Sequence, residues 1–288
     1  MSRFGVQMSL VMPPPGPVEL PSELSDLARA AGGAPDRLAM LAGGESLNAM
    51  VQQAIKAGSA GPDLQRRFEQ TASAIVQTGA VGFGEMTALH ISFTPDHPYE
   101  AAPPDHLLFL LLADIAARNN VPVDFHMDAV VQDMPTPIRF TRSSTQNPRT
   151  LAANVAAFER LLSHNRNARI VWAHVGWDNT GEMTVSLLRR LLAAHPNLYL
   201  QIKIDNPPTQ FSQNRVLDQN GTLRSEWLDL MRAFPDRFVL GTDSLYTTTG
   251  VLPSDAGLHQ MQSLVQQLPA DLARKVGFDN PIAVYRLQ

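Results

Sequence analysis

Seven short apolar runs recur along this chain at intervals of roughly 30 to 50 residues. Each run is continuous rather than strictly alternating, which is typical of strands that are covered on both faces in a parallel sheet. The pattern predicts strands at Gln7–Met12, Arg37–Ala42, Ala80–Glu85, Val121–His126, Arg169–His174, Leu198–Ile204 and Arg237–Asp243.

Segments with helical spacing of apolar residues separate these runs. Ser46 and Thr150 are residue types that cap helix starts, and Gly79 is a residue type that ends a helix. The alternation of strand and helix favours a parallel sheet with right-handed crossovers. The predicted helices are Ser46–Ala57, Asp63–Gln77, Asp105–Arg118, Thr150–His164, Glu182–Ala194, Ser225–Phe234 and Ala256–Leu268.

The fold class predicted by this alternation is α/β, with a (β/α)8 TIM-barrel-like architecture in one domain over residues 1–288. Such a barrel has eight strands, and only seven runs are present. Because the first run already begins at Gln7, the missing strand would be the first one. An open barrel has two edges with unpaired backbone groups. We expect a loop, the chain start or a second subunit of a homo-oligomer to cover them.

Four of the predicted strands end on a side chain that can bind a metal: Glu85, His126, His174 and Asp243. Parallel strands share their carboxyl edge, and in a barrel the chemistry lies at that edge. A hydrolytic Zn²⁺ needs about three protein ligands and one open position. The sequence therefore predicts a site for Zn²⁺ or another divalent metal at this rim.

The amino-acid composition limits the kinds of catalytic and metal-binding chemistry that this chain can carry. The chain is 44% hydrophobic and 17% charged, as in an ordinary globular protein. It contains no cysteine, which excludes disulfides, thiolate ligands and a cysteine nucleophile. Any metal must be held by histidine nitrogen and carboxylate oxygen. The absence of cysteine also fits a reducing compartment, so we expect a cytoplasmic protein.

The net charge of −4 comes without a basic stripe, so we expect no nucleic-acid partner. The apolar stretches Met8–Met12 and Leu107–Ala113 are too short to span a membrane, so we expect no membrane partner. Phosphate-loop, dinucleotide and Gly-x-Ser-x-Gly signatures are absent from the sequence. A small-molecule substrate is the expected partner.

The four strand ends, in this order, resemble the amidohydrolase superfamily, in particular its amidohydrolase-related (amidohydrolase-2) branch of metal-dependent hydrolases and decarboxylases. The segments that carry the resemblance are Gly82–Glu85, Asp124–Asp128, Trp172–Gly176, Gly241–Ser244 and the tail Asp279–Leu287. The resemblance implies that Glu85, His126, His174 and Asp243 bind metal. It further implies that Asp243 accepts a proton from the attacking water and that His174 orients the substrate carbonyl or holds metal.

One feature departs from that family. Its first strand ends in His-x-His, whereas the earliest histidine here is His90. The chain thus resembles a member without strand one, which leaves three alternatives. The first is a hydrolase that cleaves a C–N or C–O bond by metal-activated water. The second is a non-oxidative decarboxylase of the same fold. The third is a non-catalytic barrel that has lost its metal.

Each strand-end residue also has a purely structural interpretation. His126 would donate to Asp128, and His174 would pack against a neighbouring tryptophan. Glu85 would pair with an arginine, and Asp243 would cap the segment that follows it.

Four further residues are candidates for binding the substrate. Arg139 and Arg142 follow the fourth predicted strand, and a rim arginine commonly clamps a carboxylate. Lys203, near the end of a strand, either faces the barrel mouth or extends outward to solvent. His90 falls in a loop on the rim. Together they favour a small acidic substrate, such as a carboxylated lactone, an amide or an aromatic acid.

Overall fold

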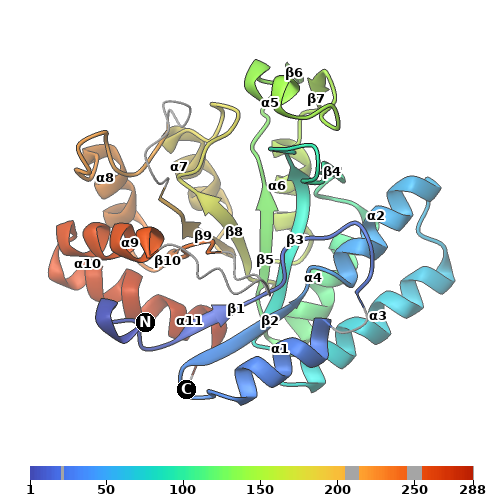
Figure 1. The fold of residues 1–288 in the computed structure, drawn as a ribbon, viewed down its shortest axis with the longest axis horizontal. Coiled ribbons are helices and arrows are strands. Elements are labelled where there is room, and N and C mark those ends of the chain that lie inside the picture. Colours follow the sequence, from blue (N-terminus) through green and yellow to red (C-terminus); the bar gives the residue numbers. More distant parts are fainter. Residues whose placement is uncertain (21–22, 205–213, 245–254, 288) are drawn as a thin grey trace.

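The computed structural model describes residues 1–20, 23–204, 214–244 and 255–287. A curled, mostly parallel sheet lies at its centre with helices packed around it, which is a TIM-barrel-like half-barrel (Figure 1). Seven parallel strands follow one another in spatial order: β1 (Ser9–Val11), β2 (Leu38–Gly43), β3 (Gly82–His90), β5 (Val123–Met127), β8 (Ile170–Val175), β9 (Leu198–Ile202) and β10 (Phe238–Leu240).

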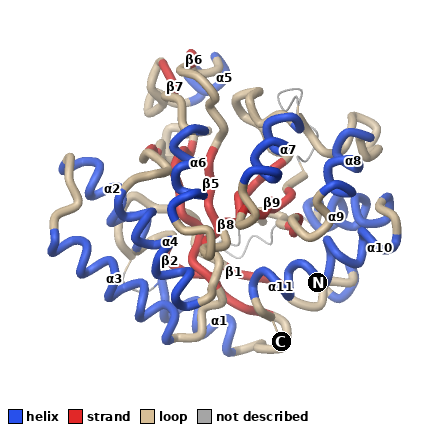
Figure 2. Tube along the Cα trace, turned by 180° about the vertical axis from the view of Figure 1, so that it is seen from behind, coloured by secondary structure: helices blue, strands red, loops and turns tan. Residues whose placement is uncertain are grey.

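Figure 2 shows the helical layer that covers the outer face of these strands. Its larger helices are α1 (Glu23–Gly32), α2 (Leu47–Ala57), α3 (Pro62–Gln77), α4 (Leu107–Asn119), α6 (Val155–His164), α7 (Val185–Ala194), α8 (Ser225–Ala233) and α9 (Ala256–Gln267). The chain begins with a 3-10 turn, η1 (Ser2–Phe4), and closes with α10 (Ala270–Arg274), a π-helical turn η2 (Lys275–Asp279) and α11 (Asn280–Tyr285).

Strand β5 shows how the sequence produces these layers. Phe125 faces outward, where its ring packs on Phe109 of α4 at 5.0 Å and on Phe158 of α6 at 5.7 Å between centroids. Its neighbours Asp124 and His126 face the barrel interior, because successive residues of a strand point to opposite faces. The apolar layer therefore fixes which polar side chains enter the barrel.

The C-terminal helix α11 closes the barrel at the end opposite the rim. Its Val284 and Tyr285 are buried against Leu41, Val171 and Val239, which the strands contribute to a second, smaller apolar cluster. The carbonyl of Val284 also accepts from Nε of the Arg169 side chain, directly before β8. The family-like tail thus seals the interior.

All seven predicted strands are present, with different ends. β3 continues to His90 because β4 (Glu100–Ala101) pairs antiparallel with its last residues. His90 therefore ends a strand, and its predicted place in a rim loop was wrong. The prediction for β10 extended to Asp243, whereas the strand ends at Leu240.

The predicted helix Thr150–His164 begins later than expected. Thr150–Leu151 form β7, which pairs with β6 (Met134–Pro135), and α6 begins at Val155 with Asn154 at its N-cap. A short helix, α5 (Ile138–Ser143), lies between these two strands. This β6–α5–β7 excursion projects beyond the rim of the barrel (Figure 1). The predicted cap at Thr150 was wrong because Thr150 pairs with Pro135 in a short antiparallel strand pair, so it is not available to begin the helix.

Strands β1 and β10 form the two ends of the sheet, and no pairing joins them within the described residues. The chain start bridges them indirectly. Arg3 of η1 pairs with Asp255, and the ring of Phe4 meets that of His259 edge-on at 4.7 Å in α9, the described helix that follows β10. The chain start therefore packs on α9, and the prediction that a loop, the chain start or a second subunit covers the sheet edges stays a prediction.

None of the described helices combines the length and the hydropathy that crossing a bilayer requires.

A buried carboxyl in α1 gives a stability prediction. Oε1 of Glu23 accepts from the Gly43 amide at 2.5 Å, and burial raises the pKa of Glu23 above its usual value. The folded state therefore binds this proton more tightly than the unfolded state, which destabilises the fold above the raised pKa. We expect Glu23→Gln to raise Tm by a few degrees at pH 7, with the gain disappearing below the usual pKa of about 4.5.

Thermal unfolding at pH 7 and pH 4 measures this difference, with Glu69→Gln on the exposed face of α3 as the control. A lower Tm for Glu23→Gln at pH 7, or the same shift at both pH values, would contradict it.

Candidate metal centre

Three of the predicted side chains converge at the carboxyl rim. Glu85 of β3, His126 of β5 and His174 of β8 each offer one ligand atom, and these atoms lie within 4.8 Å of one another. Nδ1 of His126 is 2.6 Å from Oε1 of Glu85, and Nε2 of His174 is 3.5 Å from the same oxygen. The three strands are immediate neighbours in the sheet, which explains why their ends meet.

The backbone at the end of β8 turns His174 into the site. The register between β8 and β9 shifts between Trp172 and Val175, as at a bulge, which redirects a side chain. His174 has a left-handed φ of 60°. Gly176 follows with a φ of 99°, and a Cβ there would lie 2.6 Å from Cγ2 of Val216. This turn therefore needs a glycine two residues after the histidine.

Asp243 lies at the open side of the cluster. Its Oδ1 is 3.7 Å from Nε2 of His174, and its Oδ2 pairs with the ammonium of Lys203. The side chain of Asp243 is 40% exposed, compared with 15% for His174 and 10% for Lys203. Nζ of Lys203 also lies 3.3 Å from the centroid of the Trp177 ring. The cluster is thus buried on the Glu85 side and reached by solvent on the Asp243 side.

The protonation states of the cluster leave metal-binding atoms available at neutral pH. Burial lowers the pKa of His174 to about 4, so its imidazole is neutral. Burial alone would raise the pKa of Glu85, but His174 and His126 outweigh it and lower that pKa. Burial likewise opposes ionisation of Asp243, yet His174 and Lys203 bring its pKa to about 2. Both carboxylates are therefore charged beside a neutral histidine.

Glu85 favours the protonated form of His126, so an entering cation would compete with that proton. Burial would lower the pKa of His126, but its hydrogen bond to Glu85 raises that pKa. Metal ligands must be deprotonated, so binding here would release a proton and weaken at low pH. Two imidazoles and a carboxylate, with a second carboxylate beside them, form a donor set that fits Zn²⁺ or Mn²⁺.

The described residues test the purely structural interpretations of Glu85 and His126. Glu85 pairs with the two histidines rather than with an arginine, and His126 bonds to Glu85. Asp128 accepts instead from Nδ2 of Asn179 at 2.9 Å. The capping role for Asp243 concerns residues 245–254, which lie outside the described part of the chain.

The remaining candidates lie at different places on the rim. The ring of His90 is 5.0 Å from that of His126, and burial lowers the pKa of His90 to about 3. Arg139 of α5 stacks on Phe140 and donates to the carbonyl of Asn179 at 2.8 Å. Arg142 is exposed on the same helix. The structure brings His90 and Lys203 to the cluster and places both arginines on the excursion.

Sequence reasoning missed the environment of these side chains. Trp177 under Lys203 was not singled out as a site residue, and the contact between the rings of His97 and His90, 4.4 Å apart, was not foreseen. The aromatic residue three positions after His174 was a usable signal. The contact of His97 depends on how the loop after β3 folds back, which no local pattern encodes.

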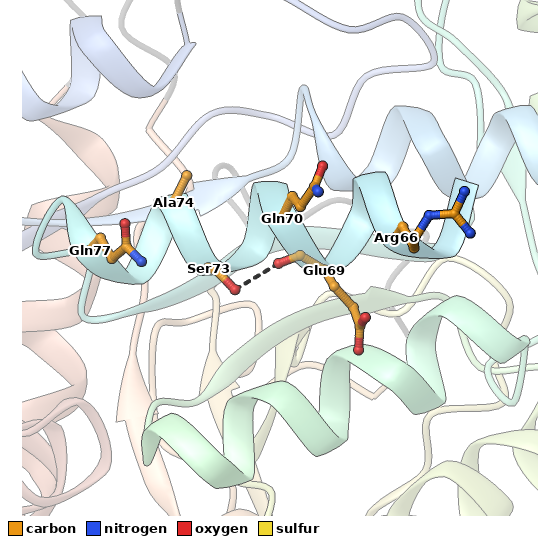
Figure 3. A pocket seen from close by; sticks show the side chains of 6 residues that line it. All are labelled: Arg66, Glu69, Gln70, Ser73, Ala74 and Gln77. Carbon is orange, nitrogen blue, oxygen red and sulfur yellow. Dashed lines mark hydrogen bonds between the residues drawn. The ribbon is translucent and has the colours of Figure 1, made fainter. Parts of the chain in front are cut away.

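A surface hollow runs along α3, away from this cluster (Figure 3). Its lining side chains all come from one helix, and Oγ of Ser73 donates to the carbonyl of Glu69 at 2.8 Å. A single helix face without converging donors has no features of a catalytic site, so the rim cluster remains the candidate.

Comparisons with known proteins agree with this geometry. The amidohydrolase family model (Amidohydro_2) matches residues 18–287. A search of curated proteins finds no match to the sequence.

Three similar solved structures illustrate the range of neighbours. An amidohydrolase from Burkholderia multivorans with bound zinc is 13% identical, with a TM-score of 0.55 over 100% of this chain and 86% of that one. A dihydroxybenzoic acid decarboxylase from Polaromonas sp. JS666, with bound manganese and 2-nitroresorcinol, is 13% identical, with a TM-score of 0.54 over 100% and 84%. A probable 2-pyrone-4,6-dicarboxylic acid hydrolase from Acinetobacter baumannii, with citric acid bound, is 12% identical, with a TM-score of 0.56 over 99% and 85%. At these identities the likeness establishes the fold.

The geometry predicts that two histidines are needed for metal binding. We expect His126→Ala and His174→Ala each to weaken Zn²⁺ binding at least about tenfold, because each removes one of about three ligands. Titration calorimetry and elemental analysis of purified protein measure the loss. His164→Ala, on α6 and paired with Asp114, is the control. Unchanged metal content in either rim variant would refute that ligand.

Proposed function

Because this chain belongs to the amidohydrolase family, we propose that it is a metal-dependent enzyme that hydrolyses a C–N or C–O bond of a small carboxylated substrate. The observation that carries the proposal is the convergence of Glu85, His126 and His174 on one point of the rim, with Asp243 beside them.

Glu85, His126 and His174 would hold the divalent ion, with Zn²⁺ as our first choice and Asp243 at its open side. When bound, such an ion polarises a substrate carbonyl and makes a water molecule more acidic. The protein contributes a carboxylate that solvent can reach, since Asp243 is the exposed member of the cluster. Asp243 would accept the proton of the attacking water on its carboxylate.

Lys203 would link substrate binding to that proton transfer. Its ammonium pairs with Asp243 and helps to hold the pKa of Asp243 at about 2, which makes the carboxylate a weak base. A substrate carboxylate that draws the ammonium away would raise the pKa of Asp243. The substrate would then improve the base that acts on it.

The rim also favours a flat substrate. The Phe93 ring meets those of Trp177 and His97 edge-on, at 6.4 Å and 5.4 Å between centroids. Such an aromatic wall suits a planar ring or lactone, while Lys203 binds its carboxylate. Arg139 and Arg142 would add positive charge from the excursion, and His90 would contact the substrate beside His126.

A non-oxidative decarboxylase is the second candidate. It is favoured by the fold shared with the manganese-containing dihydroxybenzoic acid decarboxylase. The two reactions differ in their products, since decarboxylation releases CO₂ and hydrolysis incorporates water. A panel of carboxylated lactones, amides and aromatic acids, scored for CO₂ and for ¹⁸O from labelled water, separates them. A purified protein that binds no divalent metal and is inactive on the whole panel would favour the non-catalytic barrel.

We expect Asp243→Asn to lower kcat at least about a hundredfold, because general-base catalysis contributes about 10²- to 10⁴-fold. Metal content should stay near that of the wild type, since Glu85, His126 and His174 remain. Asp255→Asn, which removes the surface partner of Arg3, is the control. Wild-type kcat in Asp243→Asn would rule out Asp243 as the proton acceptor.

We expect Lys203→Gln to raise KM for a carboxylated substrate about tenfold or more, because a charge-assisted contact is lost. The KM for a neutral amide analogue of the same substrate should change little. Steady-state kinetics on the matched pair of substrates measure the difference, with Lys56→Gln on α2 as the control. Equal effects on both substrates would argue against a carboxylate contact at Lys203.

A further inference from the structure

A layer of buried polar side chains lies directly beneath the metal centre, inside the barrel. Asp124 precedes His126 by two residues on β5, and Gln201 precedes Lys203 by two residues at β9, so each faces the same side as the rim residue above it. Tyr285 enters the layer from α11 below. None of these three groups is a proposed ligand or a substrate contact.

Hydrogen bonds connect this layer to the backbone of a proposed ligand. The Tyr285 hydroxyl donates to Oδ2 of Asp124 at 3.4 Å, and Nε2 of Gln201 donates to the same oxygen at 3.3 Å. Oε1 of Gln201 then accepts from the backbone amide of His174 at 3.3 Å. The contact with Asp124 orients the Gln201 amide so that its oxygen faces His174.

The backbone of His174 needs such a partner. The register shift between Trp172 and Val175 takes His174 out of the regular ladder with β9, and its φ of 60° is unfavourable for a side chain with a Cβ. A backbone N–H in the interior must find an acceptor. Because the bulge takes His174 out of the hydrogen-bond ladder with β9, the side-chain oxygen of Gln201 supplies the acceptor for its N–H.

The neighbouring strand leaves room for this amide. A Cβ at Gly241 would lie 2.5 Å from Cδ of Gln201, so a side chain there would displace the Gln201 amide. Gln201 is therefore held between Gly241 and Asp124.

We propose that Gln201 is a positioning residue for the metal centre, which holds the left-handed backbone of His174 through its side-chain oxygen and so aims the imidazole at Glu85 and His126. This inference rests on the proposed function, because it concerns the same metal centre. Residues that orient metal ligands from behind typically contribute ten- to a hundredfold to metal affinity.

Two substitutions separate hydrogen bonding from packing. Gln201→Met keeps the length of the side chain and removes both polar atoms, whereas Gln201→Glu keeps an oxygen that accepts from His174. Gln52→Met is the matched control, because Gln52 is also a buried glutamine and lies on α2. We expect Gln201→Met to raise the Kd for Zn²⁺ ten- to a hundredfold, Gln201→Glu to restore part of that loss, and Gln52→Met to leave the Kd unchanged.

A second measurement does not depend on metal. In metal-free protein, hydrogen exchange of the His174 amide, followed by NMR, should be faster in Gln201→Met than in the wild type and unchanged in Gln52→Met. A merely structural role for Gln201 would lower Tm without moving this amide selectively.

The outcomes distinguish this inference from the proposed function. If the wild type binds Zn²⁺ and Gln201→Met binds it as tightly, or if the His174 amide exchanges at the same rate in both, the inference fails and the proposed function stands. An equal loss of affinity in Gln52→Met would also overturn the inference. If the wild type binds no ion, the proposed function fails, and the positioning of a metal ligand fails with it.

Discussion

The Glu85 carboxylate is the group on which the rim of this barrel depends. It is almost wholly buried, and burying a charge is costly unless the charge is paired and hydrogen-bonded. His126 of β5 supplies that compensation through its hydrogen bond to Oε1 of Glu85, and Nε2 of His174 of β8 lies 3.5 Å from the same oxygen. The same contacts hold three ligand atoms together. Stability of the rim and readiness for a cation thus come from one set of interactions.

That arrangement is maintained by close packing around an unfavourable backbone. His174 and Asp243 both have left-handed φ values, of 60° and 47°, and only two other non-glycine residues do in the described part of the chain. Such residues cluster at functional sites and persist where their surroundings determine them. A side chain at Gly176 would collide with Val216, and a side chain at Gly241 would collide with Gln201. The two glycines therefore leave the space in which Val216 and Gln201 pack beside the metal centre.

The solvent exposure of the site residues also increases from the barrel interior to its mouth. Tyr285 and Asp124 are fully enclosed, the histidines are slightly exposed, and Asp243 opens to solvent beside Lys203 and Trp177. The closed end provides rigidity and the open end provides access. Neighbours of the same fold include hydrolases and decarboxylases, which is expected when a common frame carries different rim residues.

The local sequence was sufficient to predict the seven parallel strands and the rim positions of Glu85, His126 and His174. An apolar run and the residue that ends it are adjacent in the chain, and parallel strands must share one edge. The extension of β3 to His90, the start of α6 at Val155 and the place of Arg139 were decided by tertiary structure. Each depends on a pairing or packing partner distant in sequence, such as β4 for β3 and β6 for β7. The support of His174 by Gln201 belongs to the same class, because 27 residues separate two groups that only the folded sheet brings into hydrogen-bonding distance.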